Sequence, residues 1–172
     1  IYMKLDCVLT ATNNNPKYID FIPIFIKTWN KLYPEVDVKI IVIHNEIPEK
    51  FLKYKDNLIL FKPIKGMSTA FISQVIRILY PAILNYNNGI LITDMDMLPM
   101  NRTYYTDNIK DYSNDKFIYY RKARLHKKEI SICYNIATKS TWSDIFSINS
   151  INDITIKLNG IFKENNYGWS TD

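Results

Sequence analysis

Strand-like and helix-like patterns alternate over the first half of the sequence. Four β-rich or continuously apolar runs are typical of strands: residues 3–10, 36–44, 58–61 and 90–93. Between them, residues 18–33 and 68–84 carry apolar side chains at the spacing of a helix, and residues 48–54 could form a shorter one. Strands that alternate with helices in this way predict a mainly parallel sheet.

The second half of the sequence is richer in β-type residues. Residues 116–120 and 130–137 predict a hairpin or two strands joined by a loop, and we interpret the basic segment 121–128 between them as a solvated loop. A helix around Trp142 and an amphipathic segment at 151–162 follow. The complete pattern predicts an α/β fold, specifically a Rossmann-type α/β/α sandwich with a mainly parallel central sheet.

Composition and charge narrow the class of protein. With 172 residues, 47% of them hydrophobic and 23% charged, the sequence predicts one globular domain over residues 1–172. The net charge of +5 suits an anionic ligand, but no run of five or six basic residues requires nucleic acid. The ends at Ile1 and Asp172 suggest an excised domain, with a C-terminal truncation as one interpretation.

Cysteine content and the absence of targeting segments suggest a compartment. Cys7 and Cys133 both lie in apolar runs, so two buried free thiols are expected rather than a disulfide. No apolar stretch has transmembrane length, and no signal peptide is visible. These features favour a cytoplasmic protein without a transmembrane segment, and its oligomeric state is left open.

Two acids, Asp94 and Asp96, directly follow the apolar run 90–93. The carboxyl edge of an open α/β sheet is where ligands bind. In an extended chain, residues two apart point to the same side, with Cα atoms roughly 6.5 to 7 Å apart. Two such carboxylates could share a divalent cation, Mn²⁺ or Mg²⁺, and leave room for phosphate oxygens. The alternative is an Asp-x-Asp that occurs by chance, but like charges next to a core are costly unless something compensates them.

Arg77 is the only charged residue between Lys65 and Asp94, and Ser73 lies one helical turn before it. An arginine on such an apolar helix needs an acid or an anion as its partner. Both a structural ion pair, with Asp94 as a candidate acid, and a ligand anion remain open. Either would put Arg77 near the acidic pair.

In their order along the chain, these motifs resemble those of GT-A-fold glycosyltransferases of the Asp-x-Asp type. The segments that carry the resemblance are residues 10–13, 73–81, 92–98, 133–137 and 169–172. The resemblance implies a nucleotide-sugar donor and a divalent metal cofactor, Mn²⁺ or Mg²⁺. It also implies a donor-binding set: Thr10, Ala11, Thr12, Ser73, Arg77, Asp94 and Asn135.

The same resemblance implies roles at the reacting centre. Asp96 would be the firmest metal ligand, with Asp94 sharing the metal or holding ribose and sugar hydroxyls. Asp172 would lie near the anomeric carbon, acting as general base if the reaction inverts the sugar and positioning the sugar if configuration is retained. Many relatives supply a third metal ligand, often a histidine, yet neither His44 nor His126 is suitably placed.

The function that the sequence favours is metal-dependent transfer of a sugar from a nucleotide-diphosphate donor, with UDP preferred, to an acceptor hydroxyl. The acceptor, whether glycan, protein or lipid, is unknown. One alternative is a catalytically silent nucleotide- or carbohydrate-binding module. A less favoured one is an Asp-x-Asp phosphatase, because such enzymes carry their acids on the first strand.

Overall fold

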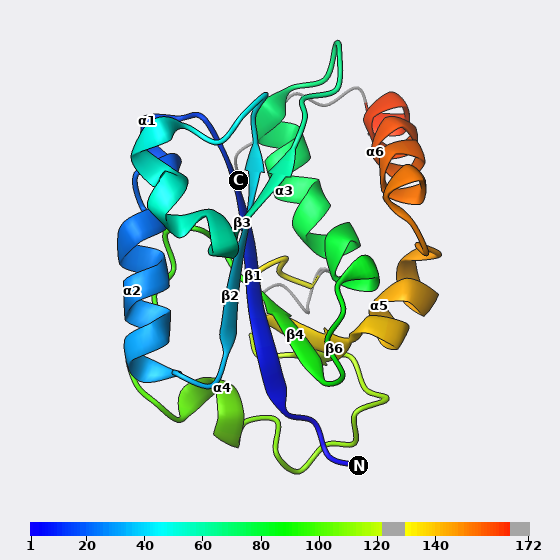
Figure 1. Ribbon diagram of the computed structural model, residues 1–172. Helices are drawn as coiled ribbons and strands as arrows, with labels where there is room; N and C mark the ends of the chain where they lie inside the picture. The colour runs from blue at the N-terminus through cyan, green and yellow to red at the C-terminus, as the bar shows by residue number, and fades with distance from the viewer. Residues whose placement is uncertain (122–129, 166–172) are drawn as a thin grey trace.

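The computed structural model describes residues 1–121 and 130–165, which fold around one six-stranded sheet (Figure 1). The strands are β1 (Leu5–Asn13), β2 (Asp37–Ile43), β3 (Leu58–Phe61), β4 (Gly89–Ile92), β5 (Ile118–Tyr119) and β6 (Asn135–Thr138). The α-helices are α1 (Pro16–Ile19), α2 (Ile22–Leu32), α3 (Thr69–Leu79), α4 (Tyr104–Asp107), α5 (Lys139–Phe146) and α6 (Ile151–Asn165). Two 3₁₀ helices are η1 (Glu49–Asn57) and η2 (Tyr80–Ile83).

The strand order is β3-β2-β1-β4-β6-β5. Strands β1 to β4 run parallel, whereas β6 is antiparallel to β4 and β5 is antiparallel to β6. The predicted α/β sandwich with a mainly parallel sheet is therefore confirmed. The two later β-rich segments pair with each other, as a hairpin requires, but form shorter strands than the pattern suggested.

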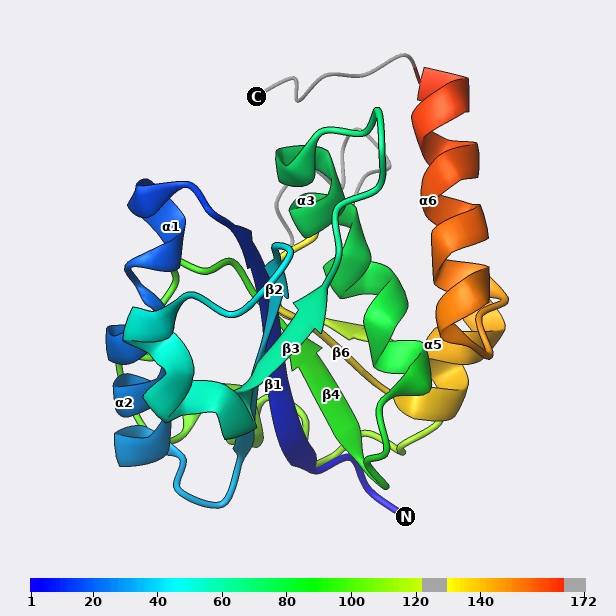
Figure 2. The same cartoon turned by 45° about the horizontal axis from the view of Figure 1, so that its top comes forward.

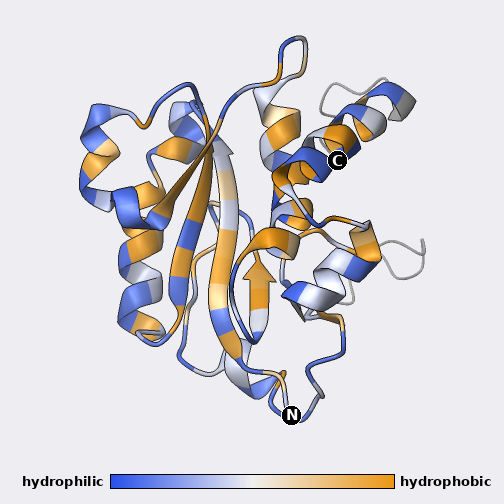
Figure 3. Ribbon diagram, turned by 45° about the vertical axis from the view of Figure 1, so that its right-hand side comes forward, coloured by the Kyte–Doolittle hydropathy of each residue, from blue (hydrophilic) through white to orange (hydrophobic). Residues whose placement is uncertain are grey.

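Helices cover both faces of the sheet (Figures 1 and 2). Helices α1 and α2 lie on one face, and α3, α5 and α6 lie on the other. Along β1 the side chains alternate between the two cores: Leu9 packs with the α3 side and Val8 with the α2 side. In Figure 3 the strands are mostly apolar and the helices are striped, as expected for a sheet buried on both faces.

Prolines set the helix boundaries that the periodicity alone misplaced. The predicted helix at 18–33 is divided into α1 and α2, with Pro16 and Pro23 in their first turns. Proline suits the start of a helix because its missing N–H would have no partner there. Helix α3 ends at Leu79, before the predicted end at residue 84, because Pro81, which lies in η2, cannot continue an α-helix.

Both cysteines are free and buried, as predicted. Burial raises the pKa of the Cys7 thiol to about 12. Among the helices in the described ranges, none combines the length and apolar character needed to span a membrane.

Candidate functional site

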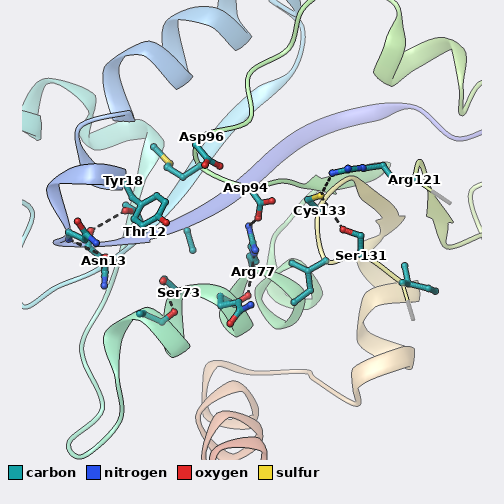
Figure 4. Close-up of a pocket in the computed structure, with 17 residues that line it drawn as sticks. Thr12, Asn13, Tyr18, Ser73, Arg77, Asp94, Asp96, Arg121, Ser131 and Cys133 are labelled. Carbon is teal, nitrogen blue, oxygen red and sulfur yellow. Dashed lines mark hydrogen bonds and ion pairs between the residues drawn. The ribbon is translucent and has the colours of Figure 1, made fainter. Parts of the chain in front are cut away.

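A pocket of about 880 Å³ opens at the carboxyl edge of the parallel strands (Figure 4). Four parts of the fold form its wall: the end of β1 with α1, helix α3, the segment after β4, and the segments that flank the β5–β6 pair. The lining residues are Ala11, Thr12, Asn13, Asn15, Tyr18, Ala70, Ser73, Gln74, Arg77, Asp94, Met95, Asp96, Arg121, Ile130, Ser131, Ile132 and Cys133.

Asp94 and Asp96 both line this pocket. The Thr93 N–H donates to the Leu9 carbonyl at 3.1 Å, which holds the end of β4 beside β1. The Met97 N–H then donates to the Asp94 carbonyl at 3.2 Å and closes a turn. The expectation of a fully extended Asp-x-Asp segment is therefore wrong: the chain turns at the acids, which nevertheless face the same cavity.

Arg77 is the buried partner of Asp94. Its side chain is 10% exposed, and one terminal nitrogen, Nη1, pairs with Asp94 Oδ1 and donates to the Thr93 carbonyl at 3.0 Å. Its Nε donates to the Gln74 carbonyl at 3.3 Å. The sequence left either an acid or a ligand anion open as the partner of Arg77, and in the structure that partner is the acid Asp94. Arg77 thus offsets the charge of Asp94. None of the described cations pairs with Asp96.

The acid pair fits a cation that is shared with a ligand. Asp96 is exposed and, within the described ranges, makes no hydrogen bond or ion pair, while the Asp94 side chain is 33% exposed. Carboxylate oxygens are the ligands that Mg²⁺ and Mn²⁺ prefer. The described residues contain no group of three or more His, Cys, Asp or Glu side chains that could hold a metal ion. A cation here would need substrate oxygens, as Mg²⁺ sites at phosphates often do.

The end of β1 reaches the pocket only with its last residues. Ala11 and Thr12, which the resemblance put in the donor-binding set, line it, but Thr10 is completely buried and does not. The Thr10 hydroxyl has no hydrogen-bond partner in the described part of the chain. Asn13 Nδ2 donates to Thr69 Oγ1 at 3.2 Å and so ties the end of β1 to the start of α3.

Helix α3 carries Ser73 into the pocket together with Arg77. The Ser73 hydroxyl donates to the Ala70 carbonyl at 2.9 Å, so its oxygen still has lone pairs to accept a hydrogen bond from a ligand. Figure 4 shows both side chains on the α3 side, below the acid pair.

Asn135 supports the wall of the pocket from behind. It is buried and does not line the cavity, and its Nδ2 donates to the Ser131 carbonyl at 2.7 Å and the Ile132 carbonyl at 3.0 Å. Beside it, Tyr134 has a φ of 62°, which a residue with a side chain rarely adopts. The Tyr134 N–H donates to the Ile92 carbonyl at 2.8 Å, and burial raises the pKa of its phenol. The role of Asn135 in donor binding stays a prediction.

Tyr18 and Arg121 are among the pocket residues that the sequence analysis did not assign to the site. Tyr18 is 41% exposed and presents its ring from α1, and Arg121 follows β5. Arg121 Nη1 donates to Cys133 Sγ at 3.3 Å, and this hydrogen bond raises the pKa of the guanidinium. Arg121 was assigned to a solvated basic loop, although its position directly after a β-rich run could have indicated the sheet edge. His44 does not line the pocket, whereas His126 and Asp172 lie outside the described residues.

Comparison with known proteins gives matches at the level of structure. No family model matches the chain, and no curated protein sequence matches it significantly. The apo-form glycosyltransferase GlyE of Streptococcus pneumoniae TIGR4 is similar at a TM-score of 0.52 and 16% identity, over 94% of this chain and 44% of that one. An active-site mutant of LgtC is similar at a TM-score of 0.50 and 12% identity, over 96% of this chain and 80% of that one.

These matches concern the fold of the chain. This chain spans less than half of the GlyE chain, and both identities are low, so the similarity concerns the fold. The sheet order, the two helical layers and the structural neighbours agree with one another. The chain has the GT-A-like fold of these glycosyltransferases, as its sequence motifs predicted.

Proposed function

We propose that this chain is a metal-dependent glycosyltransferase that uses a nucleotide-diphosphate sugar, with UDP as the favoured nucleotide. The observation that carries the proposal is the acid pair in the pocket of a GT-A-like fold. One acid, Asp94, is held and charge-compensated by Arg77, and the other, Asp96, is exposed and free to bind a cation. The structural neighbour GlyE, which is a glycosyltransferase, supports the same reaction class.

The pocket offers a separate surface for each part of such a donor. Tyr18 presents an aromatic ring beside Thr12 and Asn13, and a nucleobase can stack on a ring of this kind (Figure 4). The diphosphate would lie at Asp94 and Asp96. The sugar would then lie beyond the acids, toward the wall formed by residues 130–133.

The proposed reaction breaks the bond between the anomeric carbon and the diphosphate oxygen, which leaves with the electron pair. A divalent cation held by Asp96 and Asp94 would neutralise the charge that develops on this oxygen. The acceptor hydroxyl oxygen forms the new bond to the anomeric carbon, and its proton passes to a base. Asp172 remains the proposed base if the sugar is inverted.

The test is calorimetric titration of the chain with UDP and GDP, each in Mn²⁺ and in EDTA. We expect one nucleotide to bind in Mn²⁺ and to lose most of its affinity in EDTA. Asp96→Asn should weaken Mn²⁺-dependent binding by about tenfold or more, because it removes a charged ligand that pairs with none of the described residues. Asp111→Asn, the same change at an exposed acid outside the pocket, is the matched control and should leave binding within about twofold.

Two results would contradict the proposal. Nucleotide binding that is unaffected by both EDTA and Asp96→Asn would show that the acid pair does not hold a metal for the nucleotide. Failure of both nucleotides to bind a folded chain would contradict the proposal of a nucleotide-diphosphate sugar as donor. Release of UDP from UDP-glucose, measured in the same preparation, separates a transferase from a module that only binds nucleotide.

A further inference from the structure

Arg121 is a cation in the pocket, and none of the described acidic side chains pairs with it. The other charged lining residues are Arg77, which pairs with Asp94, and Asp96, which is free for a metal ion. No acidic side chain within the described ranges lies within ion-pair distance of Arg121. Once the proposed cation is bound at Asp96, Arg121 is the charged group of the pocket that the described residues leave without a counter-charge.

Contacts with its neighbours hold Arg121 at the wall. Its Nη1 donates to Cys133 Sγ at 3.3 Å, and the Ser131 hydroxyl lies 3.3 Å from the same sulfur. The other N–H groups of the guanidinium have no partner in the described part of the chain and remain able to bind a ligand. Ile130 and Ile132 add apolar surface beside it. Arg121 is exposed, but one hydrogen bond holds its guanidinium beside a hydroxyl and two apolar side chains.

The strand order determines which part of a ligand reaches Arg121. The sheet order β1-β4-β6-β5 puts the end of β1 at one side of the pocket, the acid pair after β4 next to it, and the segments flanking β5 and β6 beyond. Neighbouring strands lie about 4.8 Å apart. Figure 4 shows Asp96 and Arg121 on opposite sides of Asp94. A donor with its nucleoside at β1 and its diphosphate at the acids therefore extends its sugar toward Arg121.

We propose that Arg121 binds the carboxylate of an acidic sugar, on either the donor or the acceptor, and so selects an anionic substrate. This inference rests on the proposed function, because that function defines which end of the pocket receives the sugar. A guanidinium and a carboxylate match in geometry and charge, which lysine reproduces only in charge. The donor and the acceptor present the same chemistry here, and the experiment has one arm for each.

The donor arm compares UDP, UDP-glucose and UDP-glucuronate by calorimetry in Mn²⁺. If the donor carries the carboxylate, UDP-glucuronate should bind about tenfold more tightly than UDP-glucose, as expected for a charge-assisted hydrogen bond to an exposed arginine that the bound sugar would cover. Arg121→Gln should abolish this preference while the affinity for UDP itself stays within about twofold. Arg102→Gln, the same loss of charge at an exposed arginine outside the pocket, should preserve the preference.

The acceptor arm titrates methyl glucuronide and methyl glucoside, with and without UDP and Mn²⁺, and follows isoleucine methyl groups by NMR. The methyls of Ile130 and Ile132 report on the wall beside Arg121, and those of Ile24 and Ile156, exposed on α2 and α6, are remote controls. If the acceptor carries the carboxylate, the glucuronide should shift the first pair at about tenfold lower concentration than the glucoside, and Arg121→Gln should remove the difference.

The outcomes separate this inference from the proposed function. A preference for the acidic sugar in one arm that depends on Arg121 supports the inference and identifies the source of the carboxylate. Absence of that preference in both arms overturns it, whether or not a nucleotide binds, because the glycosides are also titrated alone. If Arg121→Gln weakens binding of UDP itself, Arg121 contacts the diphosphate and the inference is wrong. Failure of UDP and GDP to bind overturns only the proposed function.

Discussion

Replacing Arg77 with methionine tests whether the acid pair depends on a buried ion pair. The guanidinium of Arg77 contacts Asp94 and donates to the Thr93 carbonyl at 3.0 Å, and its side chain is only 10% exposed. Methionine retains an unbranched apolar stem in this position, so the cavity left by Arg77→Met is small. The main effect is the loss of charge and of hydrogen-bond donors.

The magnitude follows from the exposure of the two partners. A buried acceptor that loses its donor costs about 1–3 kcal/mol, and breaking a fully buried ion pair costs about 3–5 kcal/mol. Because the Asp94 side chain is 33% exposed, water screens part of its unpaired charge. We therefore expect Arg77→Met to lower the free energy of unfolding by about 2–4 kcal/mol.

Urea denaturation followed by circular dichroism measures this loss. The matched control is Lys50→Met, which breaks the exposed ion pair of Lys50 with Asp20, 2.7 Å apart, and should cost at most about 1 kcal/mol. Adding Asp94→Asn to Arg77→Met should cost less than the sum of the two single changes, because each alone leaves the other charge unpaired. The reasoning is refuted if Arg77→Met costs no more than Lys50→Met, or if its effect and that of Asp94→Asn are additive.

Two further predictions concern the fold. Gly89→Ala should destabilise the protein by about 1–3 kcal/mol, because the new Cβ would lie 2.5 Å from Ile136 Cδ1 and 2.8 Å from the Lys4 carbonyl. Gly160→Ala in α6, where a Cβ meets nothing within 4 Å, should instead stabilise it in the same urea experiment; equal effects would contradict the packing argument. Burial raises the pKa of Tyr105 and Tyr120 above the ordinary 10.0, so folding favours their neutral forms. The contribution of these two neutral phenols to the free energy of unfolding should be complete below pH 10 and decline above it. Ionisation of all tyrosines near pH 10, seen by ultraviolet absorbance without loss of fold, would contradict this prediction.

The sequence was most informative where local pattern and burial coincide. Strands β3 and β4 consist of apolar residues, and β2 ends in the apolar run 40–43, so their positions were predicted to within about one residue. The acid pair was recognisable because it directly follows such a strand, where a carboxylate must face water or a partner. Arg77 was recognisable because an isolated charge on an apolar helix needs a partner.

Other features depended on contacts between distant segments. The sequence could not decide whether Arg77 pairs with Asp94 or binds a ligand anion, because the answer depends on how α3 packs beside the end of β4. Thr10 and Asn135 match the motifs of donor-binding segments, but in the folded chain both are buried and neither lines the pocket.

The sequence by itself determined the α/β class, the order of the main elements and the position of the acids at a strand end. These follow from the spacing of apolar residues, which is a local property of the chain. Only the tertiary structure decided which side chains share the pocket. Tyr18 reaches it from a short helix, and Arg121 reaches it because β5 is joined to the sheet through β6. Such neighbourhoods arise from pairing between segments far apart in the chain, which no local pattern records.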